Sequence, residues 1–226
     1  AKQDAGTQKV IADAWEHARQ FNRKFILDED RSIQDLVRAK GVAITKPDAS
    51  SHGDLSTQRL LAHLPLALAP EATDVLVIGL GAGVTAGSVL THPVKRMTVV
   101  EVSPEVVAAS RYFNPASGAP LDDPRTRLVV DDGRTHVQRS DARYDVITSE
   151  PTNPWISGVG SLFTREFFRA CRARLKDGGV MAQWLQAYGL ADGDFASVVA
   201  TFKSEFPEAT LWRSVDGADY LLIGRT

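Results

Sequence analysis

The sequence predicts an α/β protein with a mostly parallel sheet and an antiparallel hairpin at its C-terminal end. From residue 74 onward, short apolar runs rich in β-branched residues alternate with helical stretches. Strands that alternate with helices in this way form parallel sheets covered on both faces. The last two apolar runs, 209–214 and 218–225, are joined by a short turn sequence, which is typical of a hairpin.

The other elements follow from the same alternation. Five apolar runs are the expected parallel strands: 74–80, 96–102, 127–132, 144–150 and 178–185. Five stretches with helical spacing are the expected helices: 84–92, 104–113, 134–139, 162–175 and 194–206. The fifth strand is expected to begin at the Gly178-Gly179 turn, and Asp131 or Asp132 is expected to cap the helix that follows the third strand.

The first seventy residues predict a different kind of structure. Apolar spacing indicates a helix over 8–25, and 32–46 has the pattern of two short strands around a turn. A further helix is expected over 54–70, kinked or shortened by Pro65, because proline has no N–H to donate.

These patterns predict two regions. Residues 1–70 are expected to form an N-terminal helix and β-hairpin region, with a lid over the substrate at 46–54. Residues 71–226 are expected to form the α/β domain.

Composition excludes several classes of protein. The net charge is −2 and no basic stripe is present, so nucleic acid is not an expected partner. No apolar run approaches the roughly 20 residues of a membrane helix. The single cysteine, Cys171, lies in a helical pattern and is interpreted as a packed residue in a reducing compartment. No His/Cys cluster indicates a metal site.

A glycine-rich turn follows the first strand. Gly79, Gly81 and Gly83 form G-x-G-x-G, which lets a backbone turn tightly and approach a ligand closely. The dinucleotide fingerprint would place glycine at position 84, which is Val84. The turn therefore favours a nucleoside without a pyrophosphate, although glycine turns of this kind also serve packing.

Acidic residues end the next two strands. Glu101 follows Gly79 by 22 residues, where an acid accepts hydrogen bonds from ribose hydroxyls. Asp131 and Asp132 precede Gly133, and one carboxylate there suits the amino group of adenine while the other caps a helix.

Glu150 ends the fourth strand, in the stretch SEPTNPW, whose two prolines predict a stiff loop. The carboxyl ends of parallel strands meet at one edge of a sheet, so Glu150 is expected to lie beside the bound nucleoside. It could then accept a proton from an amine or bind a cation, and the alternative is a structural acid of the loop.

Several blocks in order resemble the spermidine synthase (polyamine aminopropyltransferase) family. They include VLVIGLGAGVTAG, VVEVSPEVV, DPRTRLVVDDGRTHV and YDVITSEPTNPW, and the resemblance extends from about Ser32 to the C-terminus. In particular, the chain resembles the divergent members of the family that are often joined to membrane segments in bacteria. The resemblance implies a methyltransferase-like Rossmann sheet, so residues 71–226 are expected to be an S-adenosylmethionine-type nucleoside-binding catalytic domain. It also implies transfer of an aminopropyl group from decarboxylated S-adenosylmethionine to an amine acceptor, a step of polyamine biosynthesis.

The resemblance also implies roles for individual residues. Gln34 and Gln58 fall where the family contacts decarboxylated S-adenosylmethionine, and Glu101 falls on the ribose-binding acid. Asp132 and Gly133 fall on the adenine-binding pair. Glu150 falls on the catalytic base, which is normally Asp in the family.

The sequence departs from the family on the amine side. Ala82 replaces the aspartate that holds the aminopropyl ammonium, Thr57 replaces a tyrosine beside the polyamine, and Asn153 replaces a second acid of the loop. A negative charge is still expected near an ammonium, from Glu150 or from the candidate substrate-binding residues Asp48 and Asp54.

Two alternatives stay open. One is a methyltransferase that uses intact S-adenosylmethionine, and the other is a non-catalytic module that binds an adenosyl ligand or a polyamine. The expected partner is a small-molecule amine, without a metal, and a homodimer is expected from the family. The expected location is cytoplasmic, as a free protein or as the cytoplasmic domain of a membrane-anchored protein that this segment itself does not anchor.

Overall fold

The computed structural model describes residues 50–151, 154, 158–186, 190–214 and 219–226, with only the backbone for 50–54. The chain divides into two compact units, Ala1–Ser56 and Thr57–Thr226. The helix and the two strands expected within residues 8–46 lie outside the described residues, and the division at residue 70 stays a prediction. Among the described residues, no helix is long and apolar enough to cross a membrane.

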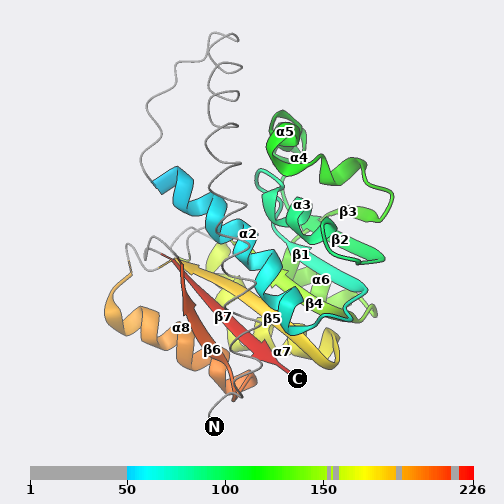
Figure 1. The fold of residues 1–226 in the computed structure, drawn as a ribbon. Helices are drawn as coiled ribbons and strands as arrows, with labels where there is room; N and C mark the ends of the chain where they lie inside the picture. The colour runs from blue at the N-terminus through cyan, green and yellow to red at the C-terminus, as the bar shows by residue number, and fades with distance from the viewer. Residues whose placement is uncertain (1–49, 152–153, 155–157, 187–189, 215–218) are drawn as a thin grey trace. The chain divides into compact units, whose positions relative to one another are not determined.

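The second unit is built on the predicted sheet (Figure 1). Its strands are β1 (Asp74–Ile78), β2 (Arg96–Glu101), β3 (Thr126–Val130), β4 (Tyr144–Ser149), β5 (Leu175–Gln186), β6 (Thr210–Arg213) and β7 (Asp219–Arg225). Their order is β3-β2-β1-β4-β5-β7-β6. The first five strands pair in parallel, and β7 runs antiparallel to both β5 and β6, which confirms the predicted fold class.

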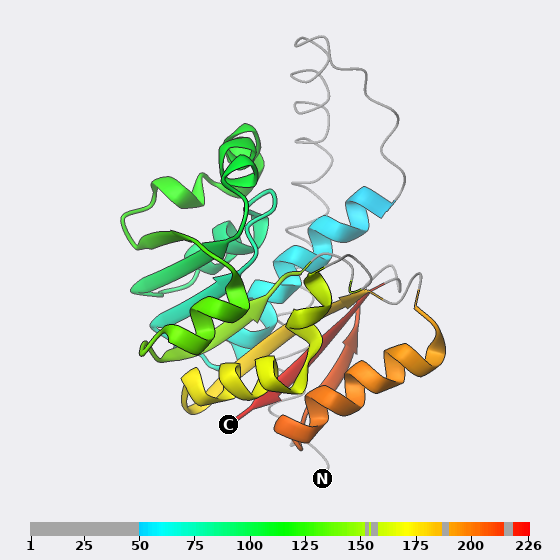
Figure 2. The same ribbon diagram turned by 180° about the vertical axis from the view of Figure 1, so that it is seen from behind.

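Helices cover both faces of the sheet. One face packs against α2 (Ser50–Leu68), α3 (Val84–Leu90) and α4 (Pro104–Ser110). The other face, turned to the viewer in Figure 2, packs against α6 (Gly133–Arg139), α7 (Arg165–Arg174) and α8 (Asp192–Glu205). Cys171 is fully buried in α7, and burial raises the pKa of its thiol, so the prediction of a packed helix residue is confirmed.

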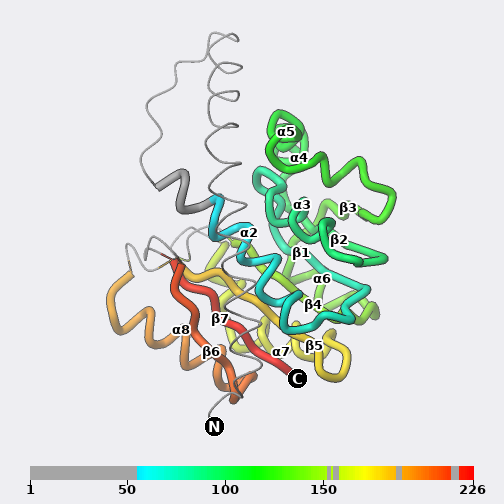
Figure 3. The backbone as a smooth tube through the Cα atoms, viewed as in Figure 1, coloured from blue at the N-terminus to red at the C-terminus, as the bar shows by residue number. Residues whose placement is uncertain are grey.

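The chain path, drawn in Figure 3, differs from the expected one in several places. The helix expected over 104–113 is α4, which ends at Ser110. It is followed by the 3₁₀ turn η1 (Arg111–Phe113) and by the short helix α5 (Asn114–Ser117). Short 3₁₀ segments also precede β3, as η2 (Pro120–Asp122), and α7, as η3 (Val159–Phe163). The fifth strand, β5, begins at Leu175, before the expected turn at Gly178. Its pairing with β4 shifts in register there, because Leu175 pairs with Tyr144 and the next pair is Val180 with Val146.

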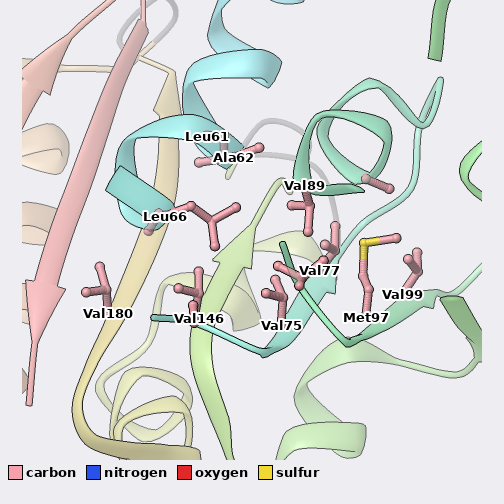
Figure 4. Packing of buried hydrophobic residues seen from close by; sticks show 14 of the residues in the cluster. Leu61, Ala62, Leu66, Val75, Val77, Val89, Met97, Val99, Val146 and Val180 are labelled. Carbon is pink, nitrogen blue, oxygen red and sulfur yellow. The ribbon is translucent and has the colours of Figure 1, made fainter. Parts of the chain in front are cut away.

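The core consists of two apolar layers, one on each side of the sheet. Along β1, Val75 and Val77 belong to the layer under α2 and α3, and Leu76 and Ile78 belong to the opposite layer. Figure 4 shows the first layer, where Leu61 of α2 packs over the strands. The unbroken burial of β1 explains why the central strands have continuous apolar sequences instead of alternating ones.

Pro65 was predicted to kink or shorten α2, and of these two alternatives the shortened helix is wrong. The helix continues to Leu68, and the N–H of Ala69 donates to the carbonyl of Pro65. A proline has no N–H, so the carbonyl four residues before it has no donor within the helix. In α2 this is the carbonyl of Leu61. The buried hydroxyl of Thr148 on β4 donates to that carbonyl over 3.0 Å, so a side chain from the sheet replaces the missing donor.

An ion-pair network joins the N-terminal ends of four strands. Lys176 Nζ lies 2.7 Å from Asp74 Oδ2 and 2.9 Å from Asp145 Oδ2, and Arg96 also pairs with Asp74. Burial opposes ionisation of Asp74, but the hydrogen bonds from Arg96 and Lys176 outweigh it and lower the pKa of Asp74 to about 2. These contacts hold the starts of β1, β2, β4 and β5 together.

His63, predicted as a helix residue packed against the sheet, is half-buried on α2. Its Nδ1 shares a hydrogen bond of 2.8 Å with Nε2 of His92, which follows α3. Burial, together with the nearby His92 and Arg59, lowers the pKa of His63 from 6.5 to about 4. The pair is therefore neutral at pH 7 and joins α2 to the end of α3.

Replacing Thr148 by Val should destabilise the protein, because the buried carbonyl of Leu61 then has no donor. We expect a loss of about 1–3 kcal/mol in the free energy of unfolding, measured by urea titration. Thr126→Val is the matched control, because the hydroxyl of Thr126 is buried and has no hydrogen-bond partner among the described residues. The control should be neutral or stabilising. Pro65→Ala restores the backbone N–H that can donate to Leu61, so Thr148→Val should cost less stability in that background. An unchanged cost would contradict the assignment.

Stability should fall as pH falls from 6.5 to about 4, partly because of His63. Its folded-state pKa lies below the unfolded one, so the unfolded state binds more protons in this window and is favoured. Asp74 adds a further loss only below about pH 4. His63→Gln stays neutral at every pH and should flatten the dependence of the unfolding free energy between pH 6.5 and 4.5. An unchanged slope would show that His63 does not titrate there.

Candidate active site at the carboxyl edge of the sheet

The predicted site residues meet at one edge of the sheet because β1, β2 and β4 end in register. Ile78 pairs with Val100 on one side and with Ser149 on the other. Beyond the strands, the N–H of Gly79 donates to Val100 over 2.9 Å and the N–H of Glu150 donates to Ile78 over 2.8 Å. The glycine turn, the end of β2 and Glu150 are therefore neighbours, as the strand-end argument predicted.

Glu101 holds the glycine turn in place. The side chain is buried, its Oε2 accepts from the N–H of Leu80 over 2.9 Å, and its Oε1 accepts from the N–H of Ser103 over 3.0 Å. Each carboxylate oxygen has a further lone pair, so ribose hydroxyls can bind in addition to these backbone donors. The acid thus fixes the backbone on which a nucleoside would lie.

Gly79 and Gly81 bring the turn against Glu150 in different ways. Gly79 has φ +92°, and a Cβ there would lie 2.6 Å from the carbonyl oxygen of Glu150, so this glycine is required by packing. A Cβ at Gly81 would have Glu150 Oε1 as its nearest neighbour, at 3.8 Å. Gly83, the N-cap residue before α3, has the left-handed conformation. The carboxylate of Glu150 therefore lies next to the open face of the turn.

The ends of β2 and β3 carry both polar and apolar groups. Asp132 caps α6, because its Oδ1 accepts from the N–H of Thr135 over 2.8 Å, and Gly133 is the buried first residue of that helix. Within the described residues, Oδ2 of Asp132 accepts no hydrogen bond. Val102 and Val130 are 66% and 51% exposed, although both are apolar. Exposed apolar side chains beside a carboxylate suit the faces and the amino group of a nucleobase.

Helix α2 brings two predicted residues to the same edge, Gln58 for the donor and Thr57 for the amine. Oε1 of Gln58 is buried and has no hydrogen-bond partner within the described chain, as expected of a group that binds a ligand. Thr57 is fully buried, and its Oγ1 donates to Asp219 Oδ2 over 3.4 Å. Ala82 is half-buried in the glycine turn.

The remaining predicted residues are not placed. Gln34, Asp48 and Asn153 lie outside the described residues, as does the side chain of Asp54. No group of three or more His, Cys, Asp or Glu side chains in the described part of the chain is arranged to hold a metal ion.

Sequence reasoning missed three polar residues on the other side of Glu150. Gln183 and Gln186 interrupt the apolar sequence of β5, and Asp219 begins β7. All three are almost fully buried, and Gln186 Nε2 donates to the carbonyl of Pro151 over 3.1 Å. Polar side chains in an otherwise buried strand were the available signal, because such groups need a partner.

Known proteins are similar to this chain in sequence and in fold. Residues 54–214 match the model of the spermine/spermidine synthase domain. Polyamine aminopropyltransferase from Bacillus subtilis is 38% identical over 153 residues, which cover 67% of this chain and 54% of that protein. Polyamine aminopropyltransferase from Escherichia fergusonii is 34% identical over 175 residues, with 71% and 60% coverage. The chain thus spans only about half of the length of the curated relatives it matches.

Solved structures agree. A spermidine synthase in complex with the transition-state analogue AdoDATO superposes with a TM-score of 0.70 at 29% identity, over 76% of this chain and 60% of that one. Human methyltransferase-like protein 13 in complex with SAH shares the fold, with a TM-score of 0.59 at 22% identity over 76% and 81% of the two chains. On the domain match and these relatives, the chain belongs to the spermine/spermidine synthase family.

Proposed function

We propose that the chain transfers an aminopropyl group from decarboxylated S-adenosylmethionine to a small-molecule amine. The observation that carries this proposal is the carboxylate of Glu150 beside the open face of Gly81 in the glycine turn. A nucleoside held by Glu101 and the turn would place its reactive sulfonium group near that carboxylate. Membership of the family supports the same reaction.

The reaction requires one proton acceptor. A neutral amine nitrogen attacks the aminopropyl carbon that is bonded to the sulfonium sulfur. The bond between this carbon and sulfur breaks, and its electron pair goes to sulfur. The products are methylthioadenosine and a protonated, aminopropylated amine, which then loses one proton. In this proposal Glu150 accepts that proton, because an amine is nucleophilic only in its neutral form.

The described residues fit the nucleoside half of the donor better than its amine half. Glu101, Asp132 and the two exposed valines offer partners for ribose and adenine. Ala82 supplies no charge for the aminopropyl ammonium, and this is the feature that favours intact S-adenosylmethionine and methyl transfer as the second candidate function. A non-catalytic binding module is the third.

Product analysis decides among the three. The chain is incubated with each donor and a panel of amines, and mass spectrometry follows methylthioadenosine, S-adenosylhomocysteine and the alkylated amines. Methylthioadenosine together with an aminopropylated amine supports the proposal. Methylated products support the second candidate, and donor binding without any product supports the third.

The location and assembly of the protein stay proposals from the sequence. We propose a cytoplasmic protein, free or attached to a membrane through another segment, that forms a homodimer. The family resemblance is the support for both.

Glu150→Gln should slow transfer by about 10²- to 10⁴-fold, the usual contribution of a general base, because the amide keeps the shape and loses the base. Methylthioadenosine binding, measured by calorimetry, should stay nearly unchanged. Glu166→Gln is the control, because Glu166 is exposed on α7 and its replacement removes the same charge. Full single-turnover activity in Glu150→Gln would make Glu150 a structural acid of the loop.

Ala82→Asp should separate the two donors. A carboxylate in the turn attracts the ammonium of the decarboxylated donor and repels the carboxylate of intact S-adenosylmethionine, so their affinities should move in opposite directions by about tenfold. Ala82→Asn introduces the same shape without the charge and should leave both affinities nearly equal to those of the wild type. Affinities that rise or fall together would show that the turn does not face the donor's tail.

A further inference from the structure

The residue after Glu150 is tied to the sheet by a side chain of β5. Gln186, the last residue of β5, donates from Nε2 to the carbonyl of Pro151 over 3.1 Å. Gln186 is only 3% exposed, and Pro151 is buried. Because a proline has no N–H, this carbonyl is the only hydrogen-bonding group that its backbone can offer. The loop that follows Glu150 is therefore anchored at its first residue.

The register of the sheet explains why Gln186 can reach the loop. The last pair between β4 and β5 joins Ser149 to Gln183, so residues 184–186 of β5 continue beyond the end of β4. These residues stay in the sheet because they pair with β7 on the other side. Gln186 thus belongs to a paired strand and contacts a segment that has just left the sheet.

Glu150 itself is held from the side of the glycine turn. Its N–H donates to the carbonyl of Ile78 over 2.8 Å, and its carbonyl oxygen packs so closely on Gly79 that a Cβ there would lie 2.6 Å away. With Gln186 as the third contact, the backbone is fixed before, at and after the residue that carries the carboxylate. These contacts set the direction from which the side chain of Glu150 approaches Gly81.

The position of a general base affects the rate of proton transfer. The base must lie within hydrogen-bonding reach of the nitrogen that loses the proton, and a displacement of about 1 Å can cost about 10²-fold in rate. Glu150 is followed by a loop and not by a strand or helix, so its own backbone supplies little of this control on that side. The hydrogen bond from Gln186 is the contact that supplies it.

We propose that Gln186 is a positioning residue for Glu150, which it keeps within reach of the attacking amine by holding the carbonyl of Pro151. The proposal rests on the proposed transfer function. Gln186 acts through the backbone of Pro151 and takes no part in proton transfer itself. The alternative is that Gln186 only satisfies a buried carbonyl, in which case its loss lowers stability and leaves the rate of transfer unchanged.

The test is a double-mutant cycle in the transfer assay. Gln186→Met keeps the length of the side chain and removes its donor, so we expect kcat to fall about tenfold, with the affinity for methylthioadenosine nearly unchanged. If this loss arises through Glu150, it disappears in the Glu150→Gln background, and the double variant should be about as slow as Glu150→Gln alone. Gln138→Met, exposed on α6, is the control and should change neither quantity.

Hydrogen exchange gives a readout that does not depend on transfer. The N–H of Glu150 lies beyond the end of β4, and in the wild type its bond to Ile78 should protect it as well as the amides of the strand. Gln186→Met should raise the exchange rate at Glu150 at least about tenfold and change the amides of β1 little.

The outcomes separate the inference from the transfer function. Additive losses in the double variant, an unchanged kcat in folded Gln186→Met or unchanged exchange at Glu150 overturns the inference. If Gln186→Met does not fold, Gln186→Leu takes its place, and an unprotected N–H of Glu150 in the wild type overturns the inference without any variant. Absence of transfer by the wild type refutes the proposed function, and the exchange measurements then decide whether Gln186 holds Glu150 in place.

Discussion

The hydroxyl of Thr148 holds α2 on the sheet at the point where Pro65 leaves the helix without a donor. The placement of one half of the site depends on this contact, because α2 brings Thr57 and Gln58 to the carboxyl edge of the sheet. Thr85 on α3 supports the same placement by donating to the carbonyl of Gln58 over 3.0 Å. The helix is therefore held by side-chain hydroxyls from two directions as well as by its apolar face.

The sheet divides the site into two halves at β4. On one side, β1, β2 and β3 supply the glycine turn, Glu101 and Asp132, all of which are tied to backbone groups. On the other side, β5 and β7 supply Gln186 and Asp219. Glu150 lies at the end of the strand between them. This arrangement suits a reaction that joins a nucleoside-borne group to an amine.

The nucleoside half could be predicted because it depends on local sequence and on one topological rule. A glycine turn, an acid at the end of a strand and a stiff loop are each visible in a few residues, and parallel strands bring their ends together. The sequence could not show that both oxygens of Glu101 already bind backbone N–H groups. That contact depends on how the turn folds back over the end of β2.

The meeting of Gln186 and Asp219 could not be predicted, because it depends on pairing between residues that are distant in the sequence. Gln186 and Asp219 face each other only in the register of β5 with β7. Likewise, the local rule for Pro65 predicted a kinked or shortened helix. A hydroxyl from a strand more than eighty residues away along the chain supplies the donor that the proline lacks. Each failure occurred where a tertiary contact supplies what the local sequence lacks.

The position of Asp219 on a terminal hairpin has a consequence for how such proteins diverge. Within the described chain, the strands that would hold the nucleoside are separate from β6 and β7, which follow all of them in sequence. A change in the hairpin acts on a part of this edge that the hydrogen bonds of Glu101 and the glycine turn do not reach. Under the proposed function, the hairpin is a part of the fold that can change while the donor's side of the site is kept.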